Sequence, residues 1–183
     1  LSREQVEQLV PAYPFAEHPT IVAGEPRGPD VVPVPDAARA LPREAGGALD
    51  RVRSAILTSG FDIPARRITL NLAPADLPKD GGRFDLAIAL GILAASGQIP
   101  ADRLDTLECL GELALSGALR PVQGVLPAAL AARQAGRALL VPTANAEEAS
   151  LASGLVVYAA DHLLEVAAHF NGITPIEPFQ AKG

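Results

Sequence analysis

A turn at residues 77–85, LPKDGGRFD, carries the densest set of residues that could take part in chemistry. A phosphate-binding P-loop requires G-x-x-x-x-G-K-[ST], but Lys79 precedes the glycines and no hydroxyl residue follows them. No other stretch fits that pattern, so we expect no ATP hydrolysis by this chain itself. A nucleophile at the turn would need a serine, threonine or cysteine, and Arg83 stands in its place. Because arginine stays protonated, it can act neither as nucleophile nor as base.

The residues of this turn favour a structural role. Gly81 and Gly82 permit backbone angles that are closed to other residues. They would redirect the chain from a strand into a helix, with Asp80 or Asp85 capping the N–H groups at the helix start. We therefore predict that the turn, from Lys79 to Asp85, is structural rather than catalytic.

Four arginines could form a basic patch. Arg51, Arg53, Arg66 and Arg67 are close in sequence, and Arg83 is a candidate to join them in space. Such a patch could contact DNA phosphates or a neighbouring subunit. The formal net charge of -6 favours the alternative, in which these side chains lie on solvated helix and strand faces.

The remaining titratable residues do not predict a metal site. His162 and His169 are seven residues apart on one expected helix, which is too far for one ion without further ligands. Cys109 falls in an expected strand and is predicted to be buried. The pair Glu147–Glu148 is predicted to lie on an exposed helix face.

The composition points to a cytoplasmic protein. A single cysteine excludes an intrachain disulfide. No apolar run reaches membrane-spanning length, and the first residues lack the pattern of a signal peptide. We therefore expect neither a membrane partner nor a cofactor in this chain.

Hydrophobic patterning predicts a mixed α/β (α+β) layer fold rather than a doubly wound parallel sheet. The expected domain covers residues 49–172, after a divergent Pro/Gly-rich segment at 1–48 that flanks or packs on it, and before a linker at 173–183. Helices are expected at 48–61, 83–97, 124–136, 143–154 and 161–172, strands at 66–73, 137–142 and 155–160, and a hairpin at 107–122 that turns at Ser116–Gly117. The helix that contains Leu49, Val52, Ile56 and Leu57 would bury those four residues as one stripe. The expected caps are Thr143 or Asn145 and Asp161, and the expected stops are Gly60 and Gly172.

Two long stretches carry a family resemblance. Residues 51–100, RVRSAILTSGFDIPARRITLNLAPADLPKDGGRFDLAIALGILAASGQIP, and residues 110–133, LGELALSGALRPVQGVLPAALAAR, closely resemble the N-terminal domain of the ComM/YifB family. The members are Mg-chelatase-like AAA+ ATPases, and the likeness extends over about residues 49–171. It implies the two-layer fold of the Lon protease proteolytic domain, which is similar to the second domain of a small-subunit ribosomal protein. Residues 1–48 depart from the usual family pattern.

The resemblance also implies which residues of this chain stand at the two catalytic positions of the protease. In Lon-type proteases the corresponding turn reads P-K-D-G-P-S-A-G and holds the nucleophilic serine, while a lysine after G-G-L is the general base. Here PKDGGRFD places Arg83 at the serine position, and QGVLPA places Leu126 at the lysine position. The resemblance therefore implies a protease-like scaffold that is not an enzyme. The alternative is a Lon-class serine peptidase with a displaced nucleophile, for which Ser96, Ser116 and Lys79 are the candidates.

Family members carry a AAA+ motor after this domain, and the resemblance implies that ATP and Mg²⁺ bind only in that module. The expected partners are the chain's own AAA+ module and neighbouring subunits of a homo-hexamer, with DNA as a further candidate. The expected role is that of a non-catalytic accessory domain that supports hexamer assembly or DNA handling in recombination and competence.

Overall fold

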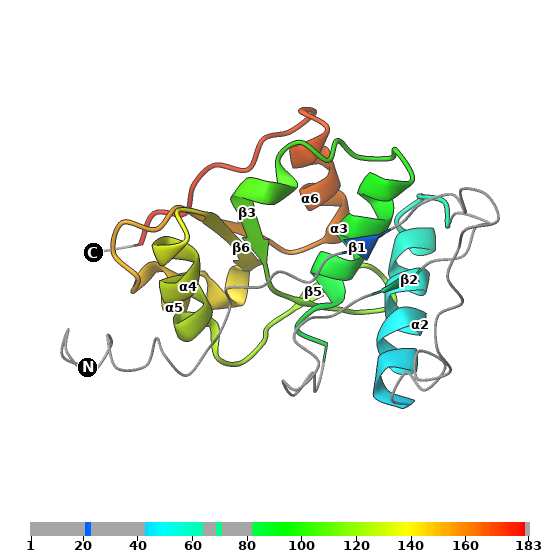
Figure 1. The fold of residues 1–183 in the computed structure, drawn as a ribbon, viewed down its shortest axis with the longest axis horizontal. Coiled ribbons are helices and arrows are strands. Elements are labelled where there is room, and N and C mark those ends of the chain that lie inside the picture. Colours follow the sequence, from blue (N-terminus) through cyan, green and yellow to red (C-terminus); the bar gives the residue numbers. More distant parts are fainter. Residues whose placement is uncertain (1–20, 23–42, 64–68, 71–81, 182–183) are drawn as a thin grey trace, which may run out of the picture.

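The computed structural model describes residues 21–22, 43–63, 69–70 and 82–181, which form a mixed α/β fold (Figure 1). In chain order the elements are β1 (Ile21–Val22), α2 (Arg43–Thr58), β2 (Thr69–Leu70), α3 (Asp85–Ala95), η3 (Leu104–Thr106), β3 (Leu107–Cys109), β4 (Glu112–Leu113), β5 (Leu119–Arg120), α4 (Val125–Gln134), β6 (Ala138–Pro142), η4 (Thr143–Asn145), α5 (Ala146–Ser150), β7 (Val157–Ala160) and α6 (Leu163–Phe170). The predicted fold class is confirmed, as are the helices at α2, α3, α4 and α6 and the strands at β6 and β7.

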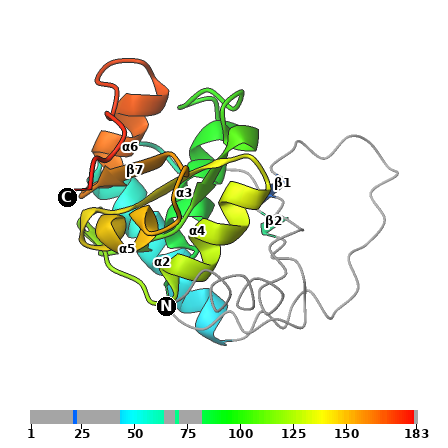
Figure 2. The ribbon, with the colours of Figure 1, turned by 90° about the vertical axis from the view of Figure 1, so that its left-hand side faces the viewer.

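A parallel sheet of β3, β6 and β7, with β6 in the middle, separates two groups of helices (Figures 1 and 2). Side chains of β6 alternate between two apolar clusters because successive residues of a strand point to opposite faces. Leu140 packs with α2, α3 and α6, whereas Leu139 and Val141 pack with α4 and α5. The sheet therefore carries helices on both of its faces.

The predicted hairpin is confirmed in part. Strands β4 and β5 pair antiparallel, and Gly117 in the connecting turn has a φ of +90°. The prediction is wrong for residues 107–109, which form β3 and join the parallel sheet beside β6. The reason lies at Gly111, whose N–H and C=O both bond to the start of α3 at Arg83 and Leu86, so the chain leaves the parallel sheet there.

Helix α2 begins at Arg43, within the range expected to be divergent, and its buried face differs from the predicted stripe. Val52 and Ile56 are buried as predicted, but Leu57 is 54% exposed. Residues 52, 55, 56 and 59 share the buried face at helical spacing, and residue 57 is turned away from it. Gly60, with a φ of +82°, ends the helix as predicted. None of the described helices combines the length and apolar character needed to cross a membrane.

Helix α6 is capped by a different residue from the one predicted. The Leu164 N–H donates to His162 Nδ1 at 3.0 Å, so His162 rather than Asp161 is the N-cap. Gly172, with a φ of +70°, ends the helix as predicted. Beyond it, residues 173–181 lie against the sheet and α6, although they belong to the segment expected to be a linker.

Candidate functional site

The start of α3 is fixed to the backbone that joins β3 to β4. The Gly111 N–H donates to the Arg83 carbonyl at 3.0 Å, and the Leu86 N–H donates to the Gly111 carbonyl at 3.1 Å. The Asp85 N–H donates to the Gly82 carbonyl at 2.9 Å, which closes the turn. Backbone hydrogen bonds therefore hold the end of the turn at residues 77–85 on both sides of the start of α3.

Asp85 is the most buried charged residue of this region, at 1% exposure. The Arg51 guanidinium donates to both carboxylate oxygens, from Nε to Oδ2 at 2.9 Å and from an Nη to Oδ1 at 3.2 Å. The Leu113 N–H also donates to Oδ2, at 3.1 Å. Burial raises the pKa of the Asp85 carboxyl, while the bonds from Arg51 and Leu113 act in the opposite direction. The prediction that Asp85 caps the helix is wrong, since its carboxylate ties α3 to α2 and β4 instead.

Gly82 leaves no space for a side chain. A Cβ placed on it would overlap Glu112 Cγ and would lie 2.8 Å from Asp85 Oδ2. The position therefore needs glycine because of this close approach to the carboxylates, not because of a left-handed backbone.

Replacing Gly82 with alanine is expected to lower the free energy of unfolding by about 1–3 kcal/mol, because Glu112 or Asp85 must move. Urea denaturation measures the change. Gly47→Ala is the matched control: among the described residues a Cβ there meets Arg51 alone, at 3.7 Å, and alanine in a helix interior stabilises by about 0.5–1 kcal/mol. Equal stability of Gly82→Ala and the parent chain would contradict the packing seen at the turn.

Arg83 occupies the position expected for the protease serine. It is half-buried, and its guanidinium carbon lies 5.6 Å from the centroid of the Phe84 ring. That distance is within the range of a cation–π contact. Residues 82–85 contain no hydroxyl or thiol, so this part of the turn offers no nucleophile. Lys79, Asp80 and Gly81 lie outside the described residues.

The second protease position lies at the start of α4. Gly124 is the N-cap and has a φ of +72°, a left-handed conformation that favours glycine. Leu126 follows in the first turn, half-buried, and packs against the cluster formed with α4, α5 and β6. The Leu126 N–H donates to Glu148 Oε1 at 3.1 Å. An aliphatic side chain therefore stands where the resemblance places the general base.

Asn145 holds the segment that leads into α4. Its side chain accepts from the Val122 N–H at 3.0 Å and donates to the Val122 carbonyl at 2.9 Å, and it is 6% exposed. Asn145 stands at the N-cap position of α5, as predicted, but its side chain bonds to Val122 and makes no cap bond. The prediction for Glu148 is wrong: Glu147 is exposed, but Glu148 is half-buried against Leu126.

The predicted basic patch is only partly within the described residues. Arg51 is turned toward Asp85, and Arg53 is exposed on α2. Arg66 and Arg67 lie outside the described residues, so a patch that contacts DNA or a subunit stays a prediction.

The two alternative nucleophiles take part in local hydrogen bonds. Ser96 Oγ donates to the Ile92 carbonyl at 2.8 Å and accepts from Gln98 Nε2 at 2.8 Å. Ser116 is exposed in the β4–β5 turn, and its Oγ accepts from the Ala118 N–H at 3.3 Å. Lys79, the proposed partner, lies outside the described residues.

In the described parts of the chain, no group of three or more His, Cys, Asp or Glu side chains could hold a metal ion. Cys109 is half-buried in β3, where burial raises the pKa of its thiol to about 12. The thiol is therefore protonated at neutral pH and is a poor nucleophile or ligand.

Comparison with known proteins supplies the family. The chain is 57% identical over 125 residues to the competence protein ComM of Haemophilus influenzae, covering 68% of this chain and 25% of that protein. It is 52% identical over 130 residues to YifB of Escherichia coli, covering 71% and 26%. A family model described as subunit ChlI of Mg-chelatase matches residues 36–145, more than half of the chain. The chain belongs to the Mg-chelatase-related ComM/YifB family.

A more distant relative of this ComM/YifB chain is Lon protease 2 of Bacillus subtilis, 33% identical over 102 residues, which cover 55% of this chain and 18% of the protease. That likeness agrees with the predicted Lon-like fold. The chain spans about a quarter of the length of the ComM and YifB relatives.

Proposed function

We propose that this chain is a non-catalytic accessory domain of a Mg-chelatase-related AAA+ ATPase. Its role is to support assembly of a hexameric ring or the handling of DNA, in recombination or competence. ATP and Mg²⁺ bind in the AAA+ module, and this domain contacts that module and neighbouring subunits. The cytoplasm is the proposed compartment.

One observation carries the proposal. The chain is related to a Lon protease, yet Arg83 and Leu126 stand at the two positions where the serine and lysine of the dyad are expected. Both positions are built into structural contacts. Arg83 belongs to the turn fixed by Gly111, and Leu126 packs into an apolar cluster. A guanidinium and an isobutyl group cannot replace a hydroxyl and an amine in acyl transfer.

The kinship to ComM supports the wider role. The relative's name links it to competence, and the family model links the chain to a Mg-chelatase subunit. Because the matched residues cover only 25% of the ComM relative, activity in the whole protein is expected from the remainder.

The purified chain is expected to leave an unfolded protein substrate uncut and to remain unlabelled by a fluorophosphonate probe. Lon protease 2 of Bacillus subtilis, assayed in parallel, is the positive control. Mass spectrometry of the labelled peptides reads the result. Labelling of Ser96 or Ser116, abolished by alanine at the same position, would establish the peptidase alternative and overturn the proposal.

The accessory role is tested on a longer protein that contains both this domain and a AAA+ module. Deletion of residues 43–181 is expected to retain ATP hydrolysis by the motor but to reduce the hexamer fraction or the stimulation of hydrolysis by DNA. Mass photometry and a coupled ATPase assay measure these quantities. If the deletion changes neither assembly nor DNA stimulation, the accessory role is rejected.

A further inference from the structure

The segment after α6 is bound to the domain along its length. We call residues 173–181 the strap. The Ile173 N–H donates to the Ala168 carbonyl at 2.9 Å, and the Phe179 N–H donates to the Val157 carbonyl at 2.7 Å. Between these ends, the Ile176 N–H donates to His169 Nδ1 at 2.8 Å. The strap is visible as the red segment at the left of Figure 1.

Side chains of the strap reach both apolar clusters. Ile176 packs against the cluster of α2, α3 and α6, and Phe179 packs against the cluster of α4, α5 and β6. Pro178 forms an antiparallel bridge with Tyr158 of β7. Because β7 is an edge strand of the three-stranded sheet, the strap covers backbone groups that would otherwise be open to pairing.

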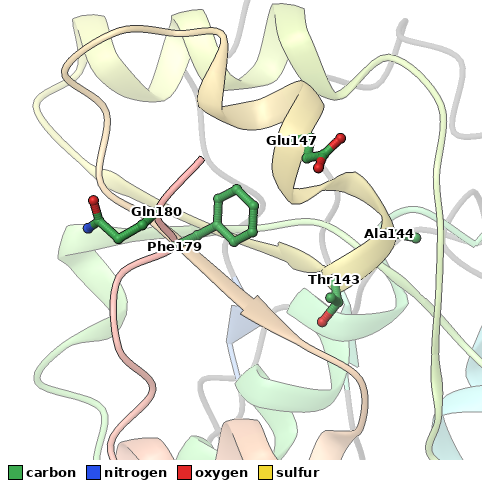
Figure 3. Close-up of a pocket in the computed structure, with 5 residues that line it drawn as sticks. All are labelled: Thr143, Ala144, Glu147, Phe179 and Gln180. Atoms are coloured by element: carbon green, nitrogen blue, oxygen red, sulfur yellow. The ribbon is translucent and has the colours of Figure 1, made fainter. Parts of the chain in front are cut away.

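The far end of the strap forms one wall of a shallow cavity of about 330 Å³. Its lining residues are Thr143, Ala144, Glu147, Phe179 and Gln180. Figure 3 shows the Phe179 ring projecting toward Thr143 and Glu147. Movement of the strap would therefore open this wall and remove an aromatic ring from the cluster beneath it.

The side chain of His169 bonds to the middle of the strap. It is 9% exposed, with its ring centroid 5.2 Å from that of Tyr158 and 5.8 Å from that of Phe170. An acceptor role at Nδ1 requires a neutral imidazole with its proton on Nε2. Protonation would place an N–H at Nδ1 directly against the Ile176 N–H, which replaces an attraction by a repulsion.

The surroundings of His169 oppose protonation. Burial lowers the pKa of its imidazole from 6.5, and the positive charge of Arg103, in the loop before η3, lowers it further. Tyr158 is the titratable group that faces the ring from β7. The strap itself offers the ring the neutral Ile176 amide. These contacts favour the neutral imidazole, which is the form that accepts the bond from the strap, and acidification is needed to break that bond.

We propose that the strap is a releasable connection, held tighter by the neutral imidazole of His169 and loosened when that imidazole is protonated. A tightly held strap fixes the direction in which the chain leaves the domain at Ala181, and a loosened strap gives that direction more freedom. The device thus links acidification to the orientation of whatever follows residue 181. It stands on the contacts of this domain alone and does not depend on the accessory role.

Amide hydrogen exchange of the whole chain at about pH 8 and about pH 5, corrected for intrinsic rates, tests the proposal. The protection factors of the Ile176 and Phe179 amides are expected to be about threefold to tenfold lower at the lower pH, which is the effect of losing one hydrogen bond. Amides of β6 and β7 are expected to keep theirs. Equal protection of the strap at the two pH values would overturn the proposal.

His169→Phe keeps a ring for packing but removes the acceptor and the titration. It is expected to show the faster strap exchange already at pH 8 and no further change at pH 5. His162→Asn is the matched control, because it replaces the histidine at the N-cap of α6 with another good N-cap residue. It is expected to retain the response of the parent chain, and a pH response that persists in His169→Phe would contradict the proposal.

If His169→Phe fails to fold, a measurement on the parent chain still tests the proposal. Long-range ¹H–¹⁵N correlation of its imidazoles at pH 8 is expected to show His169 with the proton on Nε2. A proton found on Nδ1 would exclude the bond to Ile176 and with it the strap device.

Discussion

Replacing Arg51 with methionine is expected to lower the free energy of unfolding by about 3 kcal/mol, the lower end of the range for breaking a buried ion pair. The value lies at that end because Arg51 is partly exposed, at 31% of its side chain, whereas its partner Asp85 is at 1%. Methionine preserves the packing of the stem but leaves the carboxylate without its fork of two donors. Chemical denaturation of the two proteins measures the difference.

The destabilisation of Arg51→Met should depend on pH in a definite direction. Asp85 already has a raised pKa because of burial, and loss of the guanidinium removes the main opposing contact. The folded variant then binds a proton at a higher pH than the unfolded chain, whose carboxyl titrates near 3.8. Its stability deficit is therefore large at neutral pH and shrinks as the pH falls through the raised pKa.

Arg53→Met is the control for the loss of a positive charge from α2. Arg53 is exposed two residues further along the same helix, so its replacement should leave stability unchanged. A deficit of Arg51→Met that is equal to that of Arg53→Met, or that does not vary with pH, would show that the Arg51–Asp85 pair contributes nothing specific to the fold.

The long apolar and alternating patterns were sufficient to predict most of the architecture. Helix α3 is apolar on nearly every side and lies at the centre, as its sequence predicts. The sequence predicts strand β6 and helix α4 from the same kind of pattern. These elements form because they bury many apolar side chains, and the spacing of apolar residues along the chain shows which side chains can be buried together.

The polar contacts of the candidate site could not be predicted in this way. An Asn three residues before a Glu is the spacing of a capping box, but Asn145 and Glu148 instead bond to residues more than 20 positions away. Asp85 likewise looks like a helix cap in sequence, yet it pairs with Arg51, 34 residues away. Local spacing predicts a hydrogen-bond partner that is near in the sequence. In the folded chain these side chains bond instead to partners that are distant in the sequence.

The two positions expected for a protease dyad are both held by contacts from residues that are distant in the sequence. The start of α3 is held by Gly111 and by the Arg51–Asp85 pair. The start of α4 is held by Asn145 and Glu148. In a protease such contacts would fix catalytic groups, whereas here they fix Arg83 and Leu126. The contacts therefore stabilise the fold whether or not the positions carry catalytic residues, which fits an accessory domain.

Replacing Asn145 with alanine is expected to lower the free energy of unfolding by about 3 kcal/mol, because the substitution removes two hydrogen bonds and leaves both backbone groups of Val122 without their partner. The largest local destabilisation is expected at the start of α4, because Gly124 and Leu126 follow shortly after Val122 in the chain. Denaturation gives the global effect. Hydrogen exchange of the Val122 and Leu126 amides gives the local one, and both amides should exchange faster.

Asn171→Ala is the matched control for Asn145→Ala. Asn171 is exposed after α6 and makes one side-chain bond, to the Gln98 carbonyl at 3.3 Å, so its loss should cost less than about 0.5 kcal/mol. Glu148→Gln tests the other contact, since an amide oxygen still accepts from the Leu126 N–H and should preserve most of the stability. If Asn145→Ala were no less stable than Asn171→Ala, the start of α4 would be held by its apolar packing rather than by the Asn145 bonds.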